Sequence, residues 1–208
     1  MPKVSEAYRA ARRRQILDAA QRCFLRNGFH ATSMQDIFAE AGLSAGAVYR
    51  YFPGKDAIIT AIAQETVSQV LAEVDEIIRV DPVPPLEETM ALVLRVIDAY
   101  TGPDGLTRIA VQVWGESMRD PVLAELAGGI YRGARSRFAD MARRARSAGQ
   151  VPSDVDPEDL GAVLFGLLPG YILQRLLLGD VDPATYRAGL RALVASASAA
   201  TAGPPLRA

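Results

Sequence analysis

The sequence predicts an all-α protein of about nine helices, and three features of the 208-residue chain support this prediction. Apolar residues recur, in segment after segment, at the spacing of about 3.6 residues that marks one face of a helix. Glycine and proline separate these segments, most clearly at Asp81–Pro85, which forms a stiff break. Half of the residues are hydrophobic, so the chain can build a sizeable core.

Charge is distributed unevenly along the chain. Residues 1–56 have nine Lys or Arg against five Asp or Glu, a net charge of +4, whereas residues 57–208 carry −5. A basic N-terminal module followed by an acidic body is typical of nucleic-acid contact confined to one end. We therefore expect an N-terminal DNA-binding domain over residues 1–54 and a helical domain over residues 55–208.

The first helix is predicted from about Arg9 to Asn27. Its apolar face consists of residues at helical spacing, namely Ile16, Leu17, Ala20 and Phe24. Asn27 and Gly28 form a typical helix end. Residues 1–8 are expected to form a frayed arm.

Residues 32–55, TSMQDIFAEAGLSAGAVYRYFPGK, predict two short helices joined by a tight turn. Ser33 is suited to cap the first helix and Ser44 the second, while Gly42 supplies the turn between them. The first helix has apolar residues on one face: Met34, Ile37, Phe38 and Ala41. Together with the preceding helix, this pair predicts a three-helix domain of the helix-turn-helix type.

The outer face of the second short helix begins with small residues. Ala45 and Gly46 would let its first turn approach base edges in a major groove, where helix N–H groups can also meet a phosphate. Arg50 is the long donor on this helix and the first choice for a base contact, since Arg suits guanine O6 and N7.

Two tyrosines and a lysine complete the candidate surface. Tyr49 and Tyr51 could donate hydroxyls to phosphates, with the positive charge of Lys55 beside them. The alternative is that both tyrosines pack in a small helical core, which is the favoured interpretation for Phe52.

At these positions the chain resembles a known family. The residues Thr32-Ser33-Met34-x-x-Ile37 and Ala41-Gly42-Leu43-Ser44-x-Gly46-x-x-Tyr49-x-Tyr51-Phe52-x-x-Lys55-Asp56 are similar to the DNA-binding signature of TetR-type regulators. The resemblance is specific from about Arg9 to Thr60. It implies a DNA-binding set made of Thr32, Ser33, Gln35, Ser44, Ala45, Gly46, Tyr49, Arg50, Tyr51 and Lys55.

The resemblance also implies a homodimer on double-stranded operator DNA. Its two recognition helices would enter successive major grooves of a near-palindromic operator, with half-sites about one helical turn apart, ~34–36 Å. Repression is the usual mode of the family.

The rest of the chain predicts a helical body. A long helix from Lys55 to about Val80 would connect the DNA-binding domain to this body and could act as a lever. Further helices are expected over residues 86–100, 106–118 and 121–148.

In the family, such a body binds a small-molecule effector in an apolar cavity and thereby moves the long helix. Candidate pocket residues are Met90, Leu94, Trp114, Met118, Phe138, Met141 and Phe165. Few charges lie on these faces, which favours an apolar or aromatic effector. Plain core packing is the alternative for each of them.

Residues 160–173 contain no charged side chain, so a helix there needs cover on nearly all sides. Fourteen such residues are fewer than the about 20 that span a membrane. The resemblance instead implies a four-helix dimer interface, shared with a last helix over residues 183–199. The candidate interface residues are Leu160, Val163, Leu164, Leu167, Tyr171, Gln174, Leu190, Leu193 and Val194.

Other classes of function are poorly supported. One histidine, one cysteine and no Gly-rich phosphate loop argue against an enzyme, a metal site or a bound cofactor. The N-terminus lacks the apolar core of a secretory signal, so a cytoplasmic location without membrane contact is expected. A ligand-independent DNA-binding or partner-binding helical module remains an open alternative.

Overall fold

The computed structural model of the protein describes residues 5–102 and 105–201. Within these residues it contains nine helices and no strand, so the predicted all-α class is confirmed. The helices are α1 (Glu6–Asn27), α2 (Met34–Ala41), α3 (Ala45–Tyr49), α4 (Lys55–Ile78), α5 (Leu86–Ala99), α6 (Thr107–Ser117), α7 (Pro121–Ser147), α8 (Pro157–Leu177) and α9 (Pro183–Thr201).

The chain divides into two compact units. The head unit comprises the described parts of residues 1–68 and 104–128, and the body unit those of residues 69–103 and 129–208. Helices α4 and α7 contribute residues to both units. The functional domain boundary expected at residues 54 and 55 stays a prediction.

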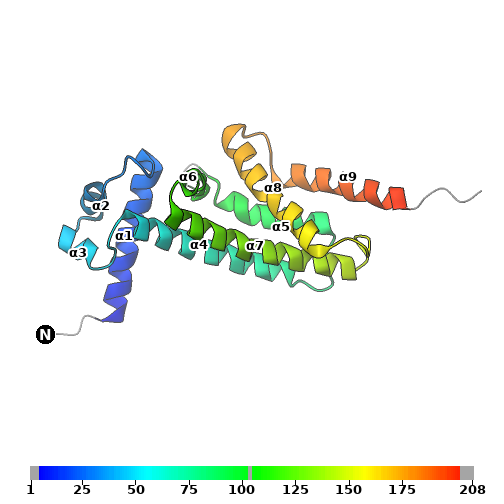
Figure 1. Cartoon of the computed structure of the whole chain (residues 1–208), viewed down its shortest axis with the longest axis horizontal. Helices are drawn as coiled ribbons and strands as arrows, with labels where there is room; N and C mark the ends of the chain where they lie inside the picture. Colours follow the sequence, from blue (N-terminus) through cyan, green and yellow to red (C-terminus); the bar gives the residue numbers. More distant parts are fainter. Residues whose placement is uncertain (1–4, 103–104, 202–208) are drawn as a thin grey trace, which may run out of the picture. The chain divides into compact units, whose positions relative to one another are not determined.

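The head unit is built on the apolar face of α1, against which α2 and α3 pack (Figure 1). Its core includes the predicted residues Ile16, Leu17, Ala20, Phe24, Ile37, Val48 and Phe52, all buried. Ile58 and Ile59, from the start of α4, lie in the same core, as do Ile109 and Val113 of α6. Helix α6 therefore packs with the helix-turn-helix pair in one unit.

Helix α1 starts three residues earlier than expected. Ser5 adopts an extended conformation and its Oγ accepts a hydrogen bond from the backbone N–H of Tyr8, so the helix begins at Glu6. The prediction that residues 1–8 form an arm was therefore wrong for residues 6–8. Tyr8 belongs to the first turn of α1.

The body unit buries apolar residues of α5 and α7, including Val93 and Ile97 of α5. Helix α8 crosses α7 closely at Gly161, where an added Cβ would lie 2.5 Å from the backbone nitrogen of Ala139. Only glycine allows this approach. Helix α5 also packs against α8 and α9.

Helix α8 is longer than the apolar run that predicted it. Asp156 caps it by accepting a hydrogen bond from the N–H of Glu158, and Pro169 lies within it. By length and composition alone it could cross a membrane. One side of it is buried in the body unit, and Val163, Leu173 and Leu177 are exposed.

Candidate nucleic-acid interface

The α2–α3 pair owes its shape to three local signals. Ser33 and Asp36 form a capping box, because the Ser33 Oγ accepts from the Asp36 N–H at 3.2 Å and Asp36 Oδ2 accepts from the Ser33 N–H at 2.8 Å. The hydrogen bonds that Asp36 Oδ2 accepts from the Ser33 N–H and the Ser33 hydroxyl hold the pKa of the Asp36 carboxyl below its usual value. Gly42 turns the chain with a φ of +64°, and the Ser44 Oγ caps α3 by accepting from the Ala47 N–H.

Burial separates the two sides of α3. Val48 faces the core with no exposure, while Ala45, Gly46, Tyr49 and Arg50 are exposed. Apart from its chain neighbours and the backbone of its own helix, no atom lies within 4 Å of the Cβ position of Gly46, so there is open space beside this residue. Small residues followed by one long donor are what a major-groove surface requires.

Tyr49 combines the packing expected of a core residue with the exposure that a phosphate contact would need. Its ring packs edge-on against Phe38 with centroids 5.4 Å apart, yet half of the residue remains exposed. Tyr51 is half-buried, whereas Ser33, Gln35 and Ser44 are exposed on the same pair of helices.

Arg50 directly follows α3, and its guanidinium makes no hydrogen bond or ion pair with any other residue that the structure describes. It borders a surface hollow of about 350 Å³ between the start of α1 and α3. The hollow is lined by Tyr8, Arg12, Leu43, Ser44, Gly46, Ala47, Arg50 and Tyr51. An exposed, unpaired guanidinium is available to a nucleic acid.

Tyr8, which the sequence interpretation placed in the N-terminal arm, was missed as a member of this surface. For Arg12 the sequence left open whether it approaches the DNA backbone or lies on a solvated helix end, and the structure places it beside Tyr8 in the lining of this hollow. Arg12 Nε donates to the Tyr8 hydroxyl at 3.0 Å, and its guanidinium lies 5.1 Å from the centroid of the Tyr8 ring. Their i, i+4 spacing could have indicated the pair, had residue 8 been assigned to the helix.

The neighbouring arginines face elsewhere. Arg13 forms an ion pair with Glu65 of α4 and lies over the Phe52 ring, and Arg14 pairs with Asp18. Both cations are therefore engaged within the head unit.

Thr32 and Lys55 act on the connector between α1 and α2. The Thr32 hydroxyl, which is buried, donates to the carbonyl oxygen of Gly28 at 2.8 Å. The Lys55 ammonium donates to the carbonyl oxygens of Phe29, His30 and Thr32 at 2.7, 3.3 and 3.0 Å. Since an ammonium has three donors, those of Lys55 are all used inside the protein, in competition with the phosphate contact expected from the sequence.

Helix α6 holds the same connector from another side. Gln112 Oε1 accepts a hydrogen bond from the Phe29 N–H at 2.9 Å, and Glu116 Oε1 lies 2.6 Å from Nε2 of His30. The imidazole is largely exposed but is paired with Glu116.

The predicted pocket residues fall into two groups. Met90, Leu94, Phe138, Met141 and Phe165 are buried in the body unit. Trp114 and Met118 belong to the head unit, where Trp114 is half-buried and Met118 is 86% exposed. The structure thus brings together five of the seven and places Met118 on the surface.

The predicted interface residues on α8 and α9 also differ in burial. Val163, Gln174 and Leu193 are exposed, and Leu160, Leu167 and Val194 are half-buried. Leu164, Tyr171 and Leu190 are buried inside their own protomer, where the Tyr171 hydroxyl donates to Asp98 Oδ1 at 2.6 Å. Leu177 and Leu178, which lie beyond Gln174 and Arg175 at the end of the predicted uncharged run, are also exposed.

Across residues 5–102 and 105–201, no three His, Cys, Asp or Glu side chains are placed to hold a metal ion. Cys23 is buried, and burial raises the pKa of its thiol.

Comparisons with known proteins place this geometry in a family. Residues 16–62 match the family described as bacterial regulatory proteins, tetR family, and residues 85–199 match the C-terminal region of BetI-type transcriptional repressors. The chain is 33% identical to the HTH-type transcriptional repressor Rv1474c of Mycobacterium tuberculosis over 88% of its own length and 91% of that protein.

Solved structures agree. Salmonella enterica GusR superposes with a TM-score of 0.75 at 26% identity, covering 94% of this chain and 98% of that one. A complex of SmeT with triclosan gives 0.74 at 25% identity, covering 90% and 91%. The chain belongs to the TetR family of bacterial regulatory proteins and is a DNA-binding transcriptional regulator, not an enzyme.

Proposed function

We propose that the protein is a homodimeric repressor that binds a near-palindromic operator and is released from it by a small effector. One observation carries the DNA side of this proposal. Arg50 is exposed and unpaired beside the unobstructed first turn of α3, in a head whose N-terminal 56 residues carry a charge of +4. A site of this kind fits the major groove of DNA.

The head residues would have separate roles on the operator. Arg50 would contact a guanine edge, since its fork matches O6 and N7. Hydroxyls and amides on the exposed face would contact phosphates and fix the register, and this set consists of Ser33, Gln35, Ser44, Tyr49 and Tyr51. Tyr8 and Arg12 join them through the hollow that they share with α3. Thr32 and Lys55 would hold the connector between α1 and α2 and would not contact the DNA.

The dimer would form through α8 and α9. Val163, Leu177 and Leu193 are 65, 77 and 69% exposed, and Leu178 follows directly after α8. Exposed large apolar residues grouped on two helices are typical of a surface that is buried in an assembly. A second subunit would also cover the exposed apolar side of α8, so this helix would not need a membrane to bury it. This agrees with a cytoplasmic regulator.

The effector would bind within the body unit. The buried apolar residues Met90, Leu94, Phe138, Met141 and Phe165 remain the candidates, and the complex of the related SmeT with triclosan supports a small-molecule effector. By linkage, an effector that weakens operator binding must itself be bound more weakly, by the same factor, when the operator is present. Helix α4 would carry this coupling as the lever.

Selection of bound fragments from random double-stranded DNA tests the operator proposal. We expect an inverted repeat with half-site centres about one helical turn apart, ~34–36 Å, or a multiple of it. The absence of any enriched sequence would contradict it.

Titration of the selected operator complex with small apolar and aromatic molecules then tests the switch. We expect at least one compound to release the DNA, and its affinity for the protein to fall equally when operator is present. Equal affinity for the free and DNA-bound protein would instead favour the ligand-independent module.

A further inference from the structure

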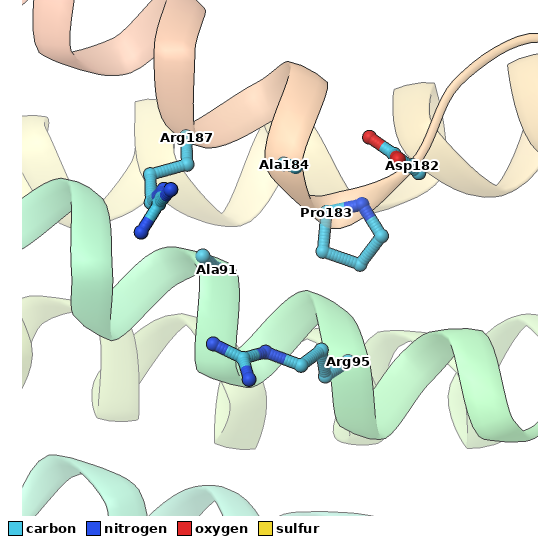
Figure 2. A pocket seen from close by; sticks show the side chains of 6 residues that line it. All are labelled: Ala91, Arg95, Asp182, Pro183, Ala184 and Arg187. Atoms are coloured by element: carbon cyan, nitrogen blue, oxygen red, sulfur yellow. The ribbon is translucent and has the colours of Figure 1, made fainter.

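A surface hollow lies between α5 and the start of α9 in the body unit, separate from the buried apolar residues considered above (Figure 2). Its volume is about 280 Å³. The lining residues are Ala91, Arg95, Asp182, Pro183, Ala184 and Arg187. Figure 2 shows the guanidinium groups of Arg95 and Arg187 reaching the part of α5 around Ala91.

The two guanidiniums share a single carboxylate. Arg187 Nη1 donates to Glu88 Oε2 at 3.0 Å, whereas Arg95 Nη2 lies 3.8 Å from Glu88 Oε1, which is too long for a hydrogen bond. Among the described residues, Arg95 makes this one ion pair and no hydrogen bond. Two positive charges with one shared partner leave one charge and most of the N–H donors without an acceptor from the protein.

Asp182 does not supply the missing acceptor. Its Oδ1 accepts from the backbone N–H of Thr185 at 2.7 Å and from the Thr185 hydroxyl at 2.8 Å, so its carboxylate is committed to capping α9. These hydrogen bonds hold the pKa of Asp182 below its usual value. The carboxylate thus stays charged near the hollow and disfavours a multiply charged anion there.

The remaining walls are small and apolar. Ala91, Pro183 and Ala184 line the hollow with short hydrocarbon surfaces that have no donor or acceptor on their side chains. A ligand in this hollow would therefore meet cationic forks and a short apolar wall. An Arg fork matches the two oxygens of a carboxylate.

We infer that this hollow binds a small organic monocarboxylate. Its carboxylate pairs with Arg95 and Arg187, and its short carbon chain lies against Ala91, Pro183 and Ala184. The ligand thereby joins α5 to α9 at a second site, independent of the effector site in the proposed function. Glu88 acts as an internal competitor, because it already occupies part of the guanidinium surface.

Isothermal titration of the full chain without DNA tests this inference, with butyrate as the probe. Butyramide, which has the same carbon chain but no charge, and inorganic phosphate are the matched ligands. Arg95→Gln and Arg187→Gln remove one guanidinium each, and Arg135→Gln on the exposed surface of α7 is the control variant. Circular dichroism establishes that each variant is folded.

We expect butyrate to bind more tightly than both matched ligands. Arg95→Gln and Arg187→Gln should weaken butyrate about tenfold to a hundredfold, as expected for the loss of a charge-assisted hydrogen bond, and Arg135→Gln should have no effect. Glu88→Gln provides an independent measurement, because it is expected to strengthen butyrate binding and not to weaken it. Because it removes the competing carboxylate, it should tighten butyrate binding by about tenfold.

Four results would overturn the inference. Failure of butyrate to bind both the wild type and Glu88→Gln would reduce the arginines to a structural clamp between α5 and α9. Equal binding of butyramide would show that the charge is not recognised. Tighter binding of phosphate, or an equal loss in Arg135→Gln, would assign the effect to a different anion or to general surface charge.

Discussion

Gln112 of α6 accepts a hydrogen bond from the backbone N–H of Phe29 in the connector that leads into α2. Glu116, one turn further along α6, lies beside His30 of the same connector, and Lys55 holds three of its carbonyl oxygens. The segment that positions the DNA-reading helices is therefore fixed by side chains from α6 and α4. A displacement of α6 would reach the reading surface through these contacts.

Gln112→Ala should loosen this connector. It removes the acceptor of a nearly buried N–H, at a cost of about 1–3 kcal/mol in the stability of the head unit. Hydrogen exchange at the Phe29 amide provides a local measurement, and this amide should exchange faster in the variant. Gln112→Glu keeps the acceptor oxygen and should retain the protection. Unchanged exchange in Gln112→Ala would show that the connector does not depend on α6.

Arg50→Ala should reduce both affinity and specificity for the operator. The loss of a bidentate guanine contact costs about 1–3 kcal/mol on the cognate site and relaxes the preference at one base position. Binding to a set of single-base operator variants measures both effects. Arg135→Ala, which is exposed on α7, is the matched control. A uniform loss on every sequence would assign Arg50 to a phosphate.

Lys55→Met should lower the stability of the head unit and should have only a small effect on the salt dependence of DNA binding. The apolar stem is kept, but three carbonyl oxygens lose their common donor, which should cost about 1–3 kcal/mol. Urea unfolding measures this loss. We expect the dependence of log K on log salt to change by less than the about one unit that follows the loss of a phosphate contact. A full unit of change would restore Lys55 to the DNA-binding set.

Arg50 and Lys55 illustrate what could and could not be predicted from the sequence. Helical spacing and the capping residues correctly predicted which faces of α2 and α3 are buried, because both depend on neighbours three or four residues away. The partners of a long flexible side chain cannot be found in this way. Lys55 meets carbonyl oxygens 23–26 residues earlier in the chain, and Arg13 meets Glu65 52 residues later.

The predictions for α8 likewise succeeded for the local pattern and failed for contacts with distant residues. The uncharged run correctly predicted an apolar helix, but periodicity could not separate residues covered by their own protomer from residues left exposed. Tyr171 lies on the covered side because Asp98 of α5 offers it an acceptor. Leu177 was missed because Gln174 and Arg175 appeared to end the apolar surface, although Arg175 turns back to Asp98 and the helix continues.

Stability should decrease at alkaline pH partly through Tyr171. Burial, and then the hydrogen bond to Asp98, raise the pKa of this phenol above its usual value of 10.0. Above about pH 10 the unfolded chain loses the phenolic proton while the folded protein retains it, so the contribution is present below that pH and is lost as the pH rises. Urea unfolding between pH 8 and 11 should show a shallower decline in Tyr171→Phe than in the exposed control Tyr49→Phe. Equal declines would contradict this assignment.

If the protein forms the proposed dimer, Val163→Asp and Leu193→Asp should each convert it into a folded monomer. Both residues are about two-thirds exposed in the protomer, so a carboxylate there meets water in the monomer but would lie in an apolar interface in the dimer. An unpaired buried charge is costly enough to dissociate an assembly, whereas helicity should not change. Sedimentation velocity measures the oligomeric state, and Met118→Asp, which is 86% exposed on the head unit, provides the control. If Met118→Asp also dissociated the protein, or if both variants on α8 and α9 stayed dimeric, the subunits would have to meet through another surface.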